Sequence, residues 1–143
     1  MLAFIDCNTY LGSPMNGGLM PPVTAESLLS AMDRAGIARA VAWHIAQYDA
    51  DPLTGNDLLA QAIAPHERLY GGWTILPTQC GELGKLDDWL RSAAAARVRV
   101  FRAFPAAGRY LLRGDVLGDM LASRFGSRFA SLRGKYEKKK LGR

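Results

Sequence analysis

The sequence predicts a parallel α/β fold built from four strand–helix units. Four short apolar runs alternate with segments whose apolar residues recur at helical spacing, and Gly or Pro stands at most of the junctions. Strands that alternate with helices at intervals of roughly 25 to 35 residues indicate right-handed βαβ crossovers, which place the strands in one parallel sheet.

The first predicted strand lies within Leu2 to Gly12, an apolar run that turns polar after Ile5. We expect a buried strand that delivers short polar side chains to its C-terminal end. Ligands bind at that end in parallel α/β folds, because the loops that leave the strands converge there.

The next segments read as a crossover helix and a second strand. Thr24 is a plausible N-cap, apolar residues follow on one face, and Gly36 ends the helix. The nearly continuous apolar run Ala40–Ala46 is typical of a strand that is buried on both faces. Asp51–Asn56 is expected to be a break before the second helix.

The rest of the folded part repeats this pattern. A second helix carries Leu58, Leu59, Ala62 and Ile63, and a third carries Leu83, Leu86, Trp89, Leu90 and Ala93. The third strand is predicted over Leu69–Leu76 and the fourth over Val98–Phe104, each stopped by a proline.

Composition sets limits on the class of protein. A hydrophobic fraction of 49% with 22% charged residues is typical of a globular domain. No apolar run approaches the roughly 20 residues that span a bilayer, and no signal peptide is recognisable, so the sequence predicts a cytoplasmic protein without a membrane span. Cys7 and Cys80 are expected to be buried reduced thiols.

The net charge of +5 comes from the end of the chain. Residues 1–122 hold ten Lys/Arg and twelve Asp/Glu, whereas residues 123–143 hold eight Lys/Arg and one acid, Glu137. We therefore predict a folded domain over 1–122 and an atypical basic tail over 123–143, partly helical or disordered, packed through Phe125 on the sheet and without a specific nucleic-acid partner.

Several short motifs occur together in a recognisable order. They are Ile5-Asp6 before Gly12, residues 34–41 (RAGIARAV), residues 52–56 (PLTGN), residues 66–71 (HERLYG) before Leu76-Pro77, and residues 99–105 (RVFRAFP). Over about residues 4 to 122 this pattern resembles the N-terminal half of the amidohydrolase-related family. The resemblance implies a partial TIM barrel of four βα units, because a complete barrel takes about 250 residues.

The same resemblance bears on metal binding. The family signature on the first strand is I-D-x-H-x-H-x-G, and its two histidines bind a divalent metal such as zinc that activates water. In this chain Asn8 and Tyr10 stand at those two positions. We therefore expect no bound cofactor or metal, and we interpret Asn8 and Tyr10 as residues that hydrogen-bond a ligand.

Two further residues are candidates for chemistry. His44, near the end of the second strand, is a candidate general acid or base. The alternative is a neutral imidazole bonded to a backbone carbonyl, which the lack of a carboxylate partner favours. Arg102, near the end of the fourth strand, is a candidate anion-binding residue, and the alternative is pairing with Asp6 or with carbonyls of the sheet.

The leading hypothesis is an amidohydrolase-related protein, hydrolase- or decarboxylase-like, that lacks the family's metal-dependent catalysis and binds a small polar or carboxylated ligand. Whether it is an enzyme stays open. The alternative is a non-catalytic binding or assembly module that completes its barrel as a homo-oligomer or with a partner half-barrel, because a half-barrel has two free strand edges.

Overall fold

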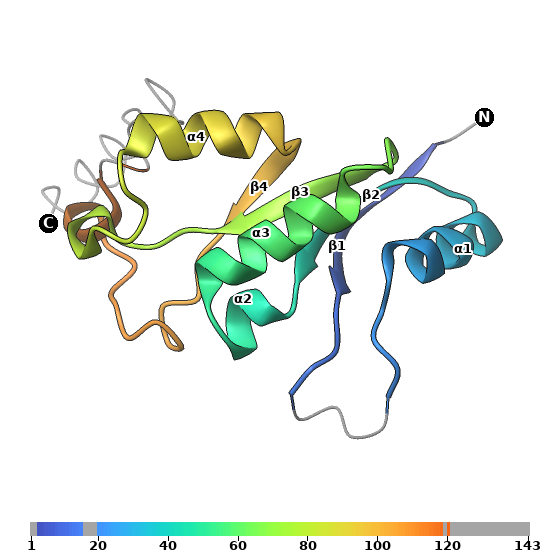
Figure 1. Ribbon diagram of the computed structural model, residues 1–143, viewed down its shortest axis with the longest axis horizontal. Helices are drawn as coiled ribbons and strands as arrows, with labels where there is room; N and C mark the ends of the chain where they lie inside the picture. The colour runs from blue at the N-terminus through green and yellow to red at the C-terminus, as the bar shows by residue number, and fades with distance from the viewer. Residues whose placement is uncertain (1–2, 16–19, 119, 121–143) are drawn as a thin grey trace, which may run out of the picture.

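The computed structural model of this chain describes residues 3–15, 20–118 and 120 (Figure 1). Its centre is a four-stranded sheet in the order β1-β2-β3-β4, with every pairing parallel. The strands are β1 (Phe4–Leu11), β2 (Ile37–His44), β3 (Leu69–Thr74) and β4 (Val98–Arg102). The predicted α/β fold with a parallel sheet is confirmed, and strands that follow one another in sequence are neighbours in the sheet.

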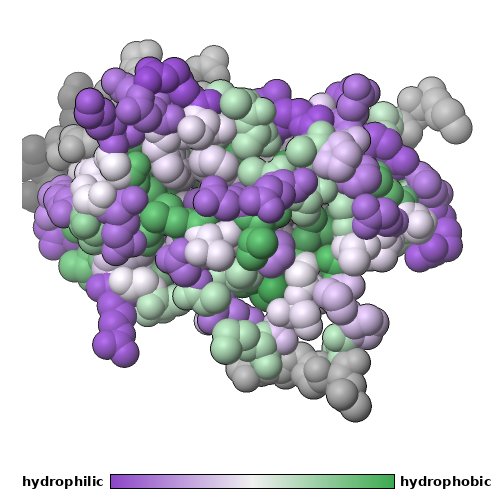
Figure 2. Space-filling model, in the orientation of Figure 1, coloured by the Kyte–Doolittle hydropathy of each residue, from purple (hydrophilic) through white to green (hydrophobic). Residues whose placement is uncertain are grey.

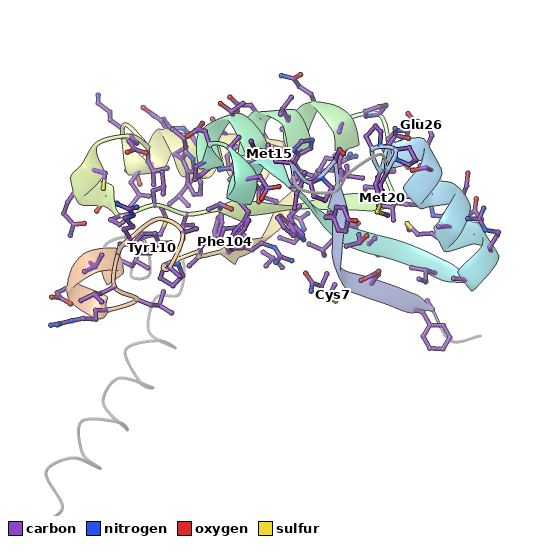
Figure 3. The ribbon with its side chains drawn as sticks, turned by 90° about the horizontal axis from the view of Figure 1, so that it is seen from below. Cys7, Met15, Met20, Glu26, Phe104 and Tyr110 are labelled. Atoms are coloured by element: carbon purple, nitrogen blue, oxygen red, sulfur yellow. The ribbon has the colours of Figure 1, made fainter. Side chains whose placement is uncertain are left out.

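The helices lie along one face of this sheet (Figures 1 and 3). They are α1 (Ala25–Ala35), the single turn α2 (Ala46–Asp49), α3 (Pro52–Ile63) and α4 (Leu86–Ala95), with a 3-10 turn η1 (Thr78–Cys80) after β3. The surface over α1 and α4 is largely hydrophilic (Figure 2), as expected of amphipathic helices whose apolar sides face the sheet. Residues 114–118 form a further short helical stretch after β4. None of α1 to α4 lies over the opposite face (Figure 3).

The predicted ends of α1 are confirmed. The Thr24 hydroxyl accepts the amide of Ser27 at 3.2 Å, and the Ser27 hydroxyl accepts the amide of Thr24 at 3.0 Å. Gly36 closes the helix in the left-handed conformation, with φ of 68°. This reciprocal capping satisfies main-chain donors that the first helical turn leaves free.

The second predicted helix starts earlier than expected, because Asp51–Asn56 holds the N-cap and the first residues of α3 instead of a break before it. Pro52 is the first helical residue, where its missing N–H leaves no hydrogen bond unmade. The Asp51 carboxylate accepts the amide of Thr54 at 2.7 Å and caps the helix. Gly55 lets α2 approach α3, since a Cβ there would lie 2.3 Å from the backbone nitrogen of Gln47.

The core lies between the sheet and the helices. Leu59 and Ile63 of α3 are buried and lie over Gly71, where a Cβ would be 3.5 Å and 3.4 Å from their methyl groups. Trp73 of β3 packs on Trp89 of α4, with ring centroids 5.3 Å apart. Side chains of α3 and α4 therefore both pack on β3, which has a strand on each side.

The prediction that the first strand is buried is wrong. Phe4 is 62% exposed and Ile5 is 55% exposed, and Cys7 on the same strand is exposed. The reason is position, because β1 ends the sheet and its N-terminal part lies outside the main core. Cys80 is also exposed, in η1, so the expectation of buried thiols is wrong for both cysteines.

Two arginines hold the edge of the sheet where the strands begin. Arg68 donates to the carbonyls of Ile37 at 2.7 Å and Ala38 at 2.9 Å. Arg97, with φ of 56°, donates to the carbonyls of Ile63, Ala64 and His66 at the end of α3. Both side chains satisfy carbonyls that helix and strand ends leave free.

The predicted tail over 123–143 and the domain boundary near residue 122 lie outside the described residues. Within the ranges that are described, no helix combines the length and the apolarity needed to cross a bilayer.

Candidate functional site

Three of the four predicted site residues come together on the face of the sheet that the helices leave open. We call the group Asn8, Tyr10, Trp43 and Arg102 the Arg102 site. Gly72 of β3 lies beneath it, because a Cβ there would be 3.5 Å from Arg102 Nε and 3.8 Å from Trp43 Cβ. The strand register therefore brings side chains from β1, β2 and β4 together over Gly72, a residue of β3 that has no side chain.

Arg102 is held by neutral groups. Its Nη2 donates to Asn8 Oδ1, and its guanidinium carbon lies 5.0 Å from the centroid of the Trp43 ring. Its Nε is buried and has no hydrogen-bond partner among the described residues. Burial lowers the pKa of the guanidinium, yet an arginine remains charged at neutral pH.

The expected pairing of Arg102 with Asp6 is not made. Asp6 instead accepts the backbone amide of Asn8 at 2.9 Å, which fixes the chain where the Asn8 side chain leaves it. No carboxylate in the described ranges forms an ion pair with Arg102. Because the Asn8 oxygen faces the guanidinium, its amide NH₂ is turned away and is available to a ligand.

A row of aromatic rings crosses the C-terminal ends of the strands. Tyr10 and Trp43 have ring centroids 6.2 Å apart, Trp43 and Phe104 5.7 Å, and Phe104 and Tyr48 5.2 Å. Phe104 follows β4 and Tyr48 lies in α2. This row connects the Arg102 site to the loops that leave β2 and β4.

A pocket of about 100 Å³ opens at the far end of this row. Tyr48, Leu76 and Phe104 are among its apolar lining residues, and Phe104 and Tyr110 lie next to one another there (Figure 3). The Tyr110 hydroxyl accepts the amide of Phe104 at 3.1 Å and donates to the carbonyl of Ile75 at 3.3 Å. Burial raises the pKa of that hydroxyl, so it stays protonated and able to donate.

Beneath the pocket lies a buried polar network that the sequence did not reveal. Gln47 donates to the carbonyl of Gly72 at 2.9 Å and accepts the Thr74 hydroxyl at 3.0 Å. Asn56 accepts the amide of Thr74 at 2.8 Å and donates to its carbonyl at 3.0 Å. All three side chains are at most 2% exposed, and their hydrogen bonds join α2 and α3 to the end of β3. The available signal was Asn56 near the start of a helix, where a buried amide needs specific partners.

His44 does not join the Arg102 site. It follows Trp43 on β2, so its side chain leaves the opposite face of the sheet. Its ring lies against Gly12, where a Cβ would be 2.9 Å from Cε1 and Nε2. Its Nδ1 accepts the amide of Ala46 at 3.2 Å, at the start of α2. The expected bond to a backbone carbonyl is therefore replaced by one from a backbone amide.

The protonation of His44 agrees with this contact. Burial lowers the pKa of the imidazole, and Nδ1 accepts a hydrogen bond only when it carries no proton. His44 is thus neutral, with its proton on Nε2, and its hydrogen bond anchors the turn that carries Gln47 and Tyr48.

The residues at the family's metal positions do not fit a divalent cation. The Asn8 oxygen already faces the positive charge of Arg102, which opposes a second cation at the same atom. Within residues 3–15, 20–118 and 120, no three His, Cys, Asp or Glu side chains gather as a ligand group.

Comparisons of the sequence with protein-family models and with curated proteins gave no match, nor did a comparison with solved structures. The resemblance to the amidohydrolase-related family thus stays a prediction made from the motifs.

Proposed function

We propose that this chain is an amidohydrolase-related protein with the wall of a partial TIM barrel, which binds a small carboxylated ligand at the Arg102 site without the family's metal-dependent catalysis. The observation that carries the proposal is a half-buried guanidinium that has no acidic partner among the described residues and is held over an aromatic ring at the C-terminal ends of parallel strands. A buried charge is normally paired, so an anionic ligand is the missing partner.

The chemistry of the donors favours a carboxylate. Arginine presents its N–H groups in a planar fork that matches the two oxygens of a carboxylate. The Asn8 NH₂ adds a donor beside it, and the Trp43 ring, 5.0 Å from the guanidinium carbon, supports the group by a cation–π contact. Tyr10, next to Trp43 in the aromatic row, supplies a hydroxyl that gives or takes a hydrogen bond.

Binding is proposed ahead of catalysis because the two described candidates for a general acid or base, His44 and Asp6, are engaged elsewhere. The Nδ1 of His44 is engaged at the start of α2, and its ring lies on the other face of the sheet. The Asp6 carboxylate is engaged by the amide of Asn8. The groups that face the ligand therefore supply orientation and charge, and they leave open whether a reaction follows.

The test is titration of the full chain with acetate and with succinate, measured by isothermal calorimetry and by tryptophan fluorescence, to which Trp43, Trp73 and Trp89 all contribute. Arg102→Gln removes the charge and should weaken binding at least tenfold, and Arg102→Lys, which keeps the charge but loses the fork, should fall between. Arg34→Gln is the matched control, since Arg34 lies exposed in the last turn of α1. Equal affinity of the parent chain and Arg102→Gln for both anions contradicts the proposal.

A further inference from the structure

Helices α1 to α4 cover one face of the sheet (Figures 1 and 3). Among the described residues, each of its two end strands, β1 and β4, has one edge that pairs with no other strand. In the strand order, β1 pairs only with β2 and β4 only with β3. The exposed apolar side chains of the strands lie on these two end strands, with Phe4 at 62% and Ile5 at 55% on β1 and Val100 at 37% on β4. Parallel sheets are normally buried on both faces, so this surface is suited to a partner.

A side-chain contact joins the two end strands across the open face. In a flat sheet, the first and fourth strands would stand about 14 Å apart, three intervals of roughly 4.8 Å, with their side chains pointing in the same direction. Here the side chain of Arg102 on β4 reaches that of Asn8 on β1 across the face. A sheet that curls toward the open face, as the wall of a barrel does, shortens this span and favours the contact.

The two end strands carry opposite charges. Asp6 is the only charged residue of β1, and Arg99 and Arg102 are the only charged residues of β4. Arg99 is exposed, with its guanidinium over the Tyr70 ring. Contact between β1 of one chain and β4 of another therefore brings opposite charges together, whereas contact between two copies of the same strand brings like charges together.

We infer that the open face docks a second copy of this chain, with β4 of each protomer alongside β1 of the other. A single two-fold axis parallel to the strands makes both seams at once and leaves no edge unpaired. The two four-stranded sheets then form an eight-stranded parallel barrel with both open faces turned inward. This inference does not depend on ligand binding at the Arg102 site.

The first experiment measures the mass of the full chain by light scattering and sedimentation over a range of concentrations. The parent chain is expected to have the mass of two chains. Asp6→Lys alone and Arg99→Glu alone should each weaken the dimer at least fivefold, and the two changes together should restore much of it. Asp57→Lys, on an exposed position of α3, is the matched control and should leave the dimer unchanged.

The second experiment identifies which strands meet. In a Cys80→Ser background, Cys7 on β1 is the one remaining thiol of the chain. Oxidation of this variant should give no cross-linked dimer, because the two Cys7 side chains lie on different seams. Adding Arg99→Cys or Val100→Cys on β4 should produce a reducible dimer, since neighbouring strands bring Cα atoms within the range of a disulfide.

The outcomes separate clearly when circular dichroism shows that each variant is folded. A monomer at every concentration overturns the inference, whether the face stays open or is covered from within the same chain. A dimer cross-linked through Cys7 alone overturns it as well, because two β1 strands then meet. A dimer that survives either single charge reversal unchanged and yields no β1-to-β4 cross-link excludes these seams.

Discussion

Arg102 on the last strand of the sheet donates a hydrogen bond to the side-chain oxygen of Asn8 on the first. This contact runs over Gly72 and beside Trp43, so it crosses every strand of the sheet. The hydrogen bond joins a neutral amide to a partly buried guanidinium. Because the amide carries no negative charge, the positive charge of Arg102 is left to attract an anion.

The first prediction uses that charge. Asn8→Asp should place a carboxylate against the guanidinium and form an ion pair that Arg102 does not make with any described residue. Because Asn8 is exposed, the free energy of unfolding should rise by only about 0.5 to 1 kcal/mol. Affinity for acetate or succinate should fall at least tenfold, since the site is already neutralised. Urea denaturation and calorimetry on the same samples measure both effects, and unchanged anion binding would count against Arg102 as the anion site.

The second prediction concerns pH. The pKa of His44 is lowered in the folded chain, while the unfolded chain has the ordinary value near 6.5. Between these two values the unfolded state binds more protons, so stability is fully present above about pH 6.5 and is lost as the pH falls toward the folded pKa. His44→Asn, whose oxygen accepts the same amide without titrating, should flatten this dependence. Urea unfolding at several values between pH 5 and pH 7.5 measures it, with His66→Gln as the comparison.

The third prediction compares two arginines with positive φ. Arg97→Gly relaxes the backbone but removes the hydrogen bonds to three carbonyls, so we expect a loss of about 2 to 3 kcal/mol in the free energy of unfolding. Arg109, with φ of 52°, lies exposed in a turn, so Arg109→Gly should stay within about 1 kcal/mol of the parent. Equal effects at both positions would show that backbone conformation, not capping, sets the role of Arg97.

The fourth prediction tests the contact between α2 and α3. A Cβ at Gly55 would lie 2.3 Å from a backbone nitrogen, so Gly55→Ala must push α2 away and should destabilise the fold by about 3 kcal/mol or more. Gly118→Ala, in the helical stretch 114–118, is the control, because a Cβ there meets no atom of the described residues within 4 Å and alanine favours the helical conformation by about 1 kcal/mol. Thermal unfolding followed by circular dichroism measures the difference. If Gly55→Ala is as stable as Gly118→Ala, the close approach is absent in solution.

The sequence was sufficient for the strand order because alternating strands and helices leave few arrangements open. It also indicated that Asn8, Tyr10 and Arg102 would lie near one another, since all three come from the same ends of parallel strands. The sequence did not show that His44 lies on the opposite face of the sheet from these three residues, because one residue along a strand reverses the direction of a side chain. The sequence contains no signal that tells which of Trp43 and His44 faces the core.

The remaining errors have a common cause in long-range packing. A Pro and a Gly within Asp51–Asn56 are local signals for a loop, but here Pro52 starts α3 and Gly55 admits α2. Cys7 lies on an apolar strand and is exposed because that strand ends the sheet. The close approach of α2 at Gly55 and the exposure of Cys7 depend on which elements become neighbours in the fold. A local sequence pattern does not predict them.

The hydrogen bonds among Gln47, Asn56 and Thr74 limit which substitutions the sequence can accept as it evolves. Each side chain satisfies a group on β3 or on another member, in a region that water does not reach. Replacing Asn56 by an apolar residue leaves the main-chain N–H and C=O of Thr74 without these partners, and replacing Gln47 does the same to the carbonyl of Gly72. Changing all three side chains together does not remove this cost, so we expect the amide side chains at positions 47 and 56 to persist among descendants of this sequence.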